Sequence, residues 1–189
     1  FPPLCGKWLK GCEAVMEPTE NKAPSYLQDE DGFARLLNDW GNRLLRLCTL
    51  YLKDVHLAED AVQETLLKAW RNADKFRGEG SELTWITRIA INVCKSYLRS
   101  PWKRRHAPAE ELDALFTSTD DPQVDDTLPR AILALSRPYR EVIILYYYQE
   151  LKAREIADIL HVDVSTVTAR LSRARKMLRE VLKGWYHDE

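Results

Sequence analysis

The spacing of the apolar residues constrains the fold most strongly, because along most of the chain it is the spacing of amphipathic α-helices. From Phe33 to Tyr51 apolar residues recur three and four positions apart, with no proline between them. The same spacing returns from Leu57, begins again near Thr84 and resumes beyond residue 129. The sequence therefore predicts an all-α protein with two groups of helices.

Charge and cysteine usage exclude several other classes of protein. The 189 residues include 28 basic and 29 acidic side chains, and the longest stretch without a charge is eight residues, Val142 to Gln149. A membrane span needs about 18 apolar residues, so we expect a soluble protein. The four cysteines form no C-x-x-C pair, and Cys48 and Cys94 lie in apolar-periodic segments. We expect small buried thiols, no metal site and a reducing cytoplasm.

Composition also divides the chain. Residues 1–15 lack the segments of a secretory signal, and we expect 1–27 to be a disordered extension with Met16 as a candidate start. We place a first helical domain at 28–103 and a second at 129–184. Between them, residues 104–128 hold seven acids against two bases and predict a flexible linker. At about 3.3 Å per residue it extends to roughly 80 Å, just beyond two turns of duplex DNA.

The third expected helix, from Thr84, has one cationic face. No acidic residue occurs between Glu82 and Glu110, and two aromatic residues, Phe76 and Trp85, flank the face. Its polar positions are Arg88, Asn92, Lys95 and Arg99. A solvated surface stripe, with Trp85 in the core, is the structural alternative. Cations beside flat rings favour single-stranded nucleic acid, which offers a charged backbone and unstacked bases.

The last block has the pattern of a helix-turn-helix. Two short helices separated at Pro138 precede a helix over 154–160, a turn at 161–163 and a long helix with Asp163 or Ser165 as its cap. From Ser165 to Lys183 this last helix has six basic residues and one acid. Its inward stripe is predicted at Val167, Leu171, Ala174, Leu178 and Val181.

The start of such a helix enters the major groove, while its later cations meet phosphates. We therefore expect four small residues to face bases: Ser165, Thr168, Ala169 and Ser172. Phosphate contacts would come from Arg170, Arg173, Arg175 and Lys176. For Arg179 and Lys183, ordinary solvation at a helix C-terminus explains the charge better.

These segments carry a family resemblance. AEDAVQETLLKAW at 58–70, FRG at 76–78, TWITRIAIN at 84–92 and YLR at 97–99 look like region 2 of bacterial RNA polymerase sigma factors of the sigma-70 family. EIA at 155–157 and TVTARLSRAR at 166–175 resemble region 4. The order and the short linker are typical of the extracytoplasmic-function (ECF) group.

The resemblance implies a sigma factor that binds core RNA polymerase, melts and captures the minus-10 strand, and reads the minus-35 duplex. Core polymerase would contact Asp60, Gln63 and Glu64. The minus-10 strand would contact the loop at 77–83 and the third helix, through Phe76, Trp85, Arg88, Asn92, Lys95, Ser96 and Arg99. The minus-35 duplex would contact Ser165, Thr166, Thr168, Ala169, Arg170, Ser172, Arg173 and Lys176. Members commonly have an anti-sigma factor, so we expect one as a further partner.

The chain also departs from the family pattern. Ser96, Lys152 and His161 stand where the family often has Asp, a Ser or Thr cap, and Gly, and Thr168 and Ala169 replace a frequent basic residue and Ser. Promoter preference therefore does not carry over. The acidic strip raises a further hypothesis, that it mimics nucleic acid inside the polymerase.

Two other classes of protein remain as alternatives. A stand-alone helix-turn-helix regulator that binds duplex DNA as a dimer explains the second block but not the cationic face near Trp85. For an enzyme, the sequence shows no nucleophile motif, no Gly-rich phosphate loop and no ligand spacing among its four histidines. We expect no catalysis, no cofactor and no small-molecule substrate.

Overall fold

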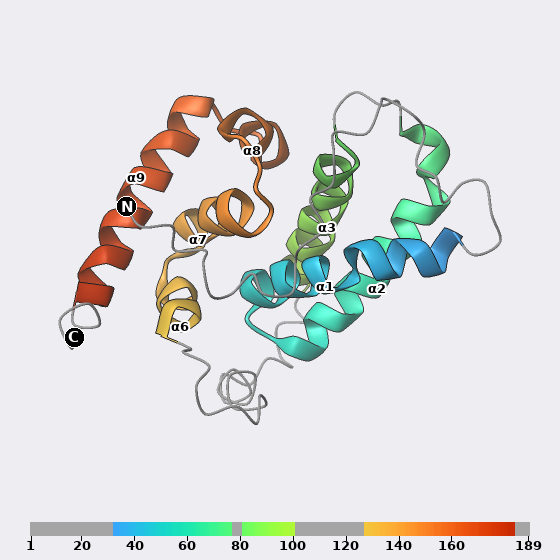
Figure 1. Cartoon of the computed structure of the whole chain (residues 1–189), viewed down its shortest axis with the longest axis horizontal. Helices are drawn as coiled ribbons and strands as arrows, with labels where there is room; N and C mark the ends of the chain where they lie inside the picture. Colours follow the sequence, from blue (N-terminus) through green and yellow to red (C-terminus); the bar gives the residue numbers. More distant parts are fainter. Residues whose placement is uncertain (1–31, 77–80, 101–126, 184–189) are drawn as a thin grey trace.

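A computed structural model describes residues 32–76, 81–100 and 127–183, and every regular element in these ranges is a helix (Figure 1). The all-α prediction is confirmed. No helix in the described ranges is long and apolar enough to cross a membrane. The predicted N-terminal extension, and all but the last two residues of the predicted linker, lie outside these ranges.

The first unit contains three long helices and one short turn. These are α1 (Gly32–Leu52), α2 (Val55–Arg71), the 3₁₀ turn η2 (Ala73–Lys75) and α3 (Glu82–Arg99). Helix α1 packs on α2 and α3, and α2 packs on α3. Their apolar stripes meet in a core that includes Leu44, Leu66 and Ile86. The helical spacing in the sequence is thus explained by burial of one face of each helix.

Two thiols lie inside this core. Cys48 on α1 and Cys94 on α3 are fully buried and free, with 3.6 Å between their sulfur atoms. The hydrogen bond between them, together with burial, raises the pKa of Cys94. Both thiols therefore act as small core residues, as predicted, and the protonated form of Cys94 is favoured.

The second unit builds the helix-turn-helix. Its elements are α6 (Thr127–Ala134), α7 (Arg137–Ile143), the π-helical turn η3 (Ile144–Tyr148), α8 (Ala153–Leu160) and α9 (Val164–Leu182). The predicted break at Pro138 is misplaced, because Pro138 lies in the first turn of α7, where a helix needs no N–H. The inward stripe of α9 is confirmed except at its end: Val181 is 62% exposed and Leu182 is buried instead.

Side-chain caps and left-handed residues set the ends of several helices. Asp54 begins α2 by accepting a hydrogen bond from Leu57 N at 2.8 Å. Ser81 begins α3 by accepting one from Thr84 N at 3.1 Å. Three non-glycine residues with positive φ follow helices: Lys53 after α1, Glu150 after η3 and His161 after α8. His161 thus takes the left-handed conformation that usually favours glycine in this turn.

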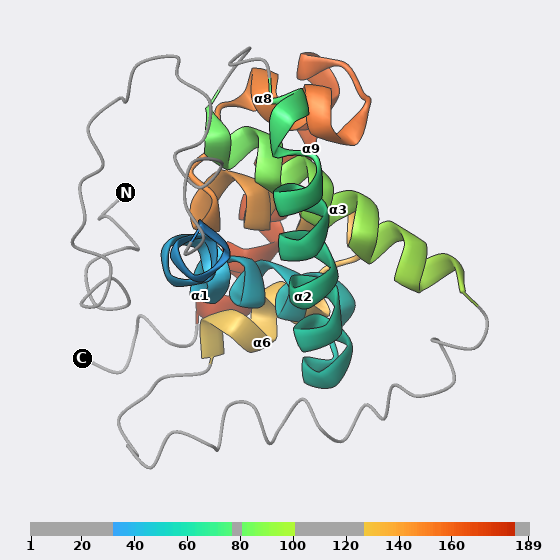
Figure 2. The ribbon, with the colours of Figure 1, turned by 90° about the vertical axis from the view of Figure 1, so that its right-hand side faces the viewer.

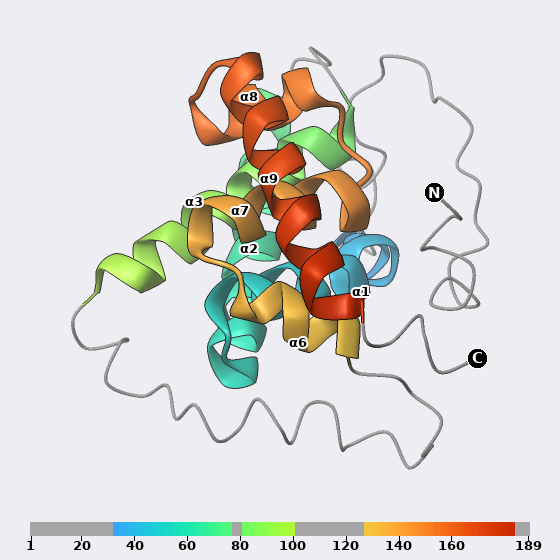
Figure 3. The same cartoon turned by 90° about the vertical axis from the view of Figure 1, so that its left-hand side faces the viewer.

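The two units pack against each other. Helix α1 contacts α6, α7 and η3, and α3 contacts α8. In Figure 1, α1 and α3 lie beside α7 and α8 at the middle of the molecule. Figure 2 shows α1, α2 and α3 in front of the second unit, and Figure 3, from the opposite side, shows α9 in front of α7 and α3. The buried residues form one continuous core.

The cap of α2 gives a prediction for stability. Replacing Asp54, which is only 2% exposed, by Ala removes the acceptor for Leu57 N. We expect Asp54→Ala to lower the free energy of unfolding by about 1 kcal/mol. Asp163→Ala is the control, because Asp163 begins α9 without a side-chain cap bond and should lose less. Urea titrations followed by circular dichroism measure both, and equal losses would contradict this role of Asp54.

Candidate nucleic-acid interface

The cationic face of α3 is open along much of its length. Four of the predicted minus-10 residues are exposed on it: Arg88, Asn92, Ser96 and Arg99. Lys95 is half-buried. The Ser96 hydroxyl donates to Val93 O at 2.8 Å, so it is held on its own helix. The face therefore presents cations and an amide, the groups that a nucleic-acid backbone and bases require.

Aromatic and carboxylate contacts fix the beginning of α3. The rings of Phe76 and Trp85 lie with centroids 5.4 Å apart and planes tilted by 55°, and both are half-buried. Trp40 on α1 donates from its ring nitrogen to Glu82 at 3.2 Å. Phe76 and Trp85 are therefore in contact although residues 77–80, which lie outside the described ranges, separate them in the sequence. The first turn of α3 is also bonded to α1 through Glu82.

Charges from the second unit act on this face. Burial lowers the pKa of Lys95. The negative charge of Glu141 raises this pKa in part, and the positive charge of Arg137 lowers it further. Arg88 lines an open hollow of about 460 Å³ with residues of α8 and of the turn before α9. The cationic face of α3 therefore borders the second unit.

The predicted polymerase-binding residues lie on the outer face of α2. Asp60 and Gln63 are exposed, whereas Glu64 is half-buried and forms a 2.7 Å ion pair with Lys68. Burial, together with Glu64, raises the pKa of Tyr97 on α3, so Glu64 also has a structural role. The structure leaves Asp60 and Gln63 as the accessible polar pair.

Two apolar residues that sequence reasoning did not assign to this face are also exposed there. Leu67 is 40% exposed and Trp70 is 48% exposed. Trp70 packs edge-to-face on Phe33 of α1, with ring centroids 6.3 Å apart. Leu67 lies seven positions after Asp60 and therefore on the same side of α2. This spacing could have assigned Leu67 to the face from the sequence.

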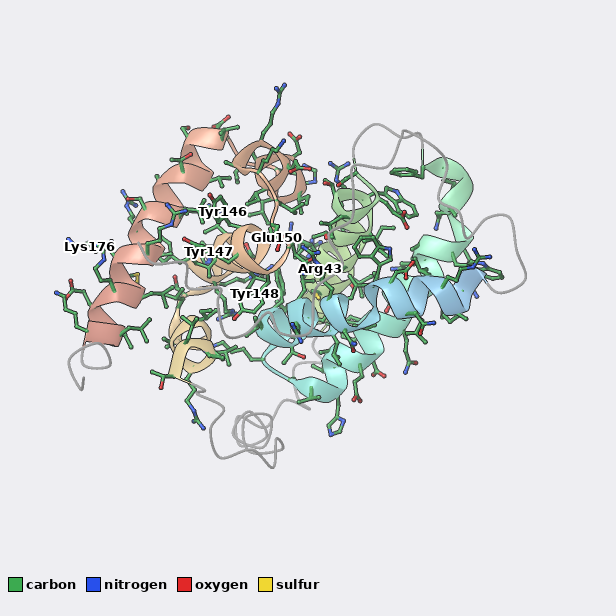
Figure 4. The ribbon with its side chains drawn as sticks, viewed as in Figure 1. Arg43, Tyr146, Tyr147, Tyr148, Glu150 and Lys176 are labelled. Carbon is green, nitrogen blue, oxygen red and sulfur yellow. The ribbon has the colours of Figure 1, made fainter. Side chains whose placement is uncertain are left out.

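The beginning of α9 is exposed as predicted for a reading helix. Ser165, Thr168, Ala169 and Ser172 are exposed, and so are Arg173 and Lys176, while Thr166 and Arg170 are half-buried. The hydroxyl of Thr168 donates to Val164 O at 2.9 Å, so it is held on its own helix. Lys176 points away from the molecule in Figure 4.

Arg175, predicted among the phosphate contacts, has partners within the protein. Its Nε donates to the Tyr147 hydroxyl at 2.9 Å, and its guanidinium lies 5.2 Å from the centroid of the Tyr146 ring. Both tyrosines come from η3, and Figure 4 shows them between α7 and α9. Sequence reasoning missed this contact, because the residues are 28 positions apart.

The predicted sites thus form separate surfaces. The α3 face borders α7 and α8, the reading face of α9 points outward, and the polymerase-binding face of α2 lies on the far side of the first unit (Figures 1 and 2). Among the described residues, no group of three or more His, Cys, Asp and Glu side chains is placed to hold a metal ion.

Comparison with known proteins assigns the family. Residues 36–104 match Sigma-70 region 2, and residues 125–178 match Sigma-70, region 4. The ECF RNA polymerase sigma factor SigW of Bacillus subtilis is 31% identical over an alignment of 175 residues, and the match covers 82% of this chain and 91% of that protein. The chain belongs to the ECF sigma factors. The two groups of helices are region 2 and region 4, as the resemblance implied.

Other comparisons agree. The RNA polymerase sigma-H factor of Pseudomonas aeruginosa is 27% identical over an alignment of 170 residues, and the match covers 82% of this chain and 88% of that protein. Among solved structures, the sigma factor RpoE of Bartonella quintana, in complex with the anti-sigma factor NepR, has a TM-score of 0.65 and 26% identity, covering 84% of this chain and 99% of that chain.

The half-buried carboxylate of Glu82 gives a prediction with a defined pH dependence. Burial raises its pKa, while the Trp40 hydrogen bond opposes that shift. A raised pKa means that the folded state holds the proton more tightly, so stability is greatest below the ordinary glutamate value and falls as pH rises through the raised one. Glu82→Gln keeps an acceptor for Trp40 and removes the charge. We expect higher stability at pH 7 and a flatter pH profile.

Thermal unfolding between pH 4 and pH 8 measures this effect. Asp60→Asn on α2 is the matched control, because Asp60 is an exposed carboxylate and should leave the profile unchanged. If Glu82→Gln lowered the melting temperature at pH 7, the ionised carboxylate would be a stabilising partner of Trp40 and the inferred sign would be wrong.

Proposed function

We propose that this sigma factor binds core RNA polymerase and directs promoter-specific transcription initiation, with region 2 capturing the minus-10 strand and region 4 reading the minus-35 duplex. The observation that carries the proposal is the pair of exposed surfaces in one chain: a cationic face beside an aromatic pair on α3, and an outward helix in a helix-turn-helix. A stand-alone duplex regulator would need only the second surface.

Core polymerase would dock on the outer face of α2. Asp60 and Gln63 offer an acidic and amide pair to a basic partner, and exposed Leu67 adds apolar area between them. Interface cores gain most from apolar and aromatic anchors, while charges at the rim set orientation. We therefore assign Leu67 and Trp70 to this interface together with the predicted polar residues.

The melted minus-10 strand would lie on α3. Arg88, Asn92 and Arg99 face the strand, and the tilted Phe76–Trp85 pair is placed beside the beginning of the helix, where an unstacked base would pack. Moving a base out of the duplex stack costs a few kcal/mol, and the contacts that the base makes in such a site can offset this cost on binding. This part of the reaction needs no nucleotide hydrolysis by the chain, and we assign it no catalytic step or cofactor.

The minus-35 duplex would meet the beginning of α9. Ser165, Ala169 and Ser172 are small and exposed, so they permit close approach of the helix to base edges in the major groove. Arg173 and Lys176 follow on the same helix and would contact phosphates. Arg175 is assigned instead to holding η3 against α9.

We assign two further properties by analogy. The solved complex of RpoE with the anti-sigma factor NepR supports an anti-sigma factor as a partner of this chain as well. Because its action requires RNA polymerase, the chain would work in the cytoplasm.

Reconstitution with bacterial core polymerase tests the function, with transcript starts mapped across genomic DNA. We expect new starts that require both core and this chain. Asp60→Lys should weaken core binding by at least about tenfold, because like charges meeting across an interface cost several kcal/mol. Asp39→Lys is the matched control, because it makes the same change of charge at an exposed position of α1, outside this interface. Absence of any start dependent on the chain would overturn the proposal.

A second experiment tests the reading helix. Arg173→Ala should weaken minus-35 duplex binding and reduce the slope of log affinity against log salt by about 1, the value expected for one lost phosphate contact. Lys183→Ala is the control, because Lys183 pairs with Glu180 at 2.6 Å and lies beyond the end of α9. Fluorescence anisotropy over a salt series measures both. Equal slopes for Arg173→Ala and the unchanged chain would remove Arg173 from the interface.

A further inference from the structure

Two thiols in the core of region 2 lie close enough to react with each other. Cys48 on α1 and Cys94 on α3 are 46 positions apart in the sequence, and Cys94 donates its S–H to Cys48 with 3.6 Å between the sulfur atoms. They are the only cysteines in the described ranges, and each is 0% exposed. A disulfide bond is about 2 Å long, so the two sulfurs must approach by about 1.6 Å to form one.

The packing of the two helices permits this approach. Helices α1 and α3 contact each other directly, and each cysteine lies inside its helix (Figure 1). Within the described ranges, no backbone hydrogen bond joins α1 to α3, so side-chain packing holds them together. Packed helices shift by about 1–2 Å in many conformational changes. The movement that a disulfide requires is therefore within the range that such a helix pair can make.

The surroundings of the pair decide which thiol reacts first. The hydrogen bond to Cys48 and burial raise the pKa of Cys94, while the positive charge of Arg137 on α7 lowers it in part. Only the thiolate is a nucleophile, so Cys94, whose protonated form is favoured, is the poorer first attacker. Cys48 is therefore the thiol that reacts with an oxidant, and Cys94 is the thiol that completes the disulfide.

We propose that Cys48 and Cys94 form an oxidative modification site, at which hydrogen peroxide or another small hydroperoxide converts the two thiols into a disulfide that joins α1 to α3. The Cys48 sulfur attacks one peroxide oxygen, the O–O bond breaks, and the displaced hydroxide takes the thiol proton and leaves as water. The Cys94 sulfur then attacks the sulfenic acid of Cys48, the S–O bond breaks, and a second water leaves. The thiols lose two electrons and two protons, and the peroxide gains them.

Burial selects the kind of oxidant. Because both sulfurs are 0% exposed, a reagent reaches them through brief local openings of the helices, which admit a small molecule more readily than a protein. The pair is therefore open to a peroxide and closed to direct exchange with the disulfide of another protein. Disulfides in a reducing cytoplasm are transient and usually serve in catalysis or redox sensing. We therefore expect the bond to be reversed when peroxide is removed and thiols are restored.

The disulfide would also move the minus-10 face. Protein cores are packed as densely as organic crystals, so an approach of about 1.6 Å between the sulfurs is taken up by a shift of α3 relative to α1. Arg88, Asn92 and Arg99 belong to α3 and shift with it. A binding surface needs its side chains within about 0.5 Å of their productive positions. The oxidised chain should therefore capture the minus-10 strand poorly. This consequence rests on the proposed function, whereas the disulfide itself does not.

Peroxide treatment of the full chain tests the site. Cys5→Ser and Cys12→Ser are introduced first, so that Cys48 and Cys94 are the only thiols. The chain is treated with hydrogen peroxide, the excess is removed with catalase, and the free thiols are alkylated in denaturant before mass spectrometry of the proteolytic peptides. We expect one pair of peptides joined through Cys48 and Cys94, which dithiothreitol separates. Two alkylated, unlinked thiols after peroxide treatment would overturn the proposal.

Two further measurements test the folded state and the order of attack. The disulfide should form in the absence of urea, and a disulfide that appears only at urea concentrations that unfold region 2 would overturn the site. A short exposure to peroxide in the presence of dimedone, which traps sulfenic acids, should label Cys48. Label on Cys94 instead would contradict the assigned order. Cys94→Ala removes the second thiol, so we expect more label on Cys48 in that variant and no disulfide.

Transcription measures the consequence for region 2. The oxidised chain, freed of peroxide, is added to core polymerase, and we expect core-dependent transcription to fall at least about tenfold, because a misplacement of about 1 Å can cost this much or more. Dithiothreitol should restore it. A chain with Cys48→Ala and Cys94→Ala, treated in the same way, is the control and should stay active.

The outcomes separate the two proposals. Equal transcription by the oxidised and the reduced chain would overturn the effect on the minus-10 face and leave the sigma function intact. Lack of transcription in every form, including the untreated chain, would reject the proposed function, while the peptide analysis would still decide whether Cys48 and Cys94 form a disulfide.

Discussion

Burial of α1 on two sides is the constraint on which the rest of the structure depends. One side of the helix packs on α2 and α3, and its C-terminal half also packs on α6, α7 and η3. Leu44, Leu47 and Tyr51 are almost completely buried as a result. Without α1, region 2 would lose its core and region 4 would lose its contact with region 2. The same helix therefore supports both a domain and the junction between domains.

The elements and their faces were predictable because apolar spacing follows directly from burial. The helix-turn-helix, the exposed face of α3 and the open beginning of α9 all follow from periodicity in short windows. The exact ends of the helices were harder to predict, because Lys53, Glu150 and His161 take positive φ although they are not glycine. Pro138 was read as a break, although proline is also favoured in a first helical turn.

Contacts between distant segments could not be predicted from local patterns. Tyr51 and Glu141 are 90 positions apart, and Arg43 and Gln149 are 106 apart. In the sequence these four residues look like ordinary residues of a helical protein. Local patterns therefore did not predict the docking of the two units. Arg175 shows the same limit: its charge indicated a phosphate contact, whereas its position beside Tyr146 and Tyr147 indicates a structural one.

The two carboxylate oxygens of Glu155 accept hydrogen bonds from different units. One accepts from Thr84 of region 2 at 2.6 Å, and the other accepts from Lys152 N at 2.8 Å, within its own unit, at the start of α8. The bond from Lys152 N closes the first turn of α8 without any group of region 2. The start of the helix-turn-helix is therefore fixed inside region 4, and a substitution at Thr84 would remove the tie to region 2 while leaving the capped start of α8 in place.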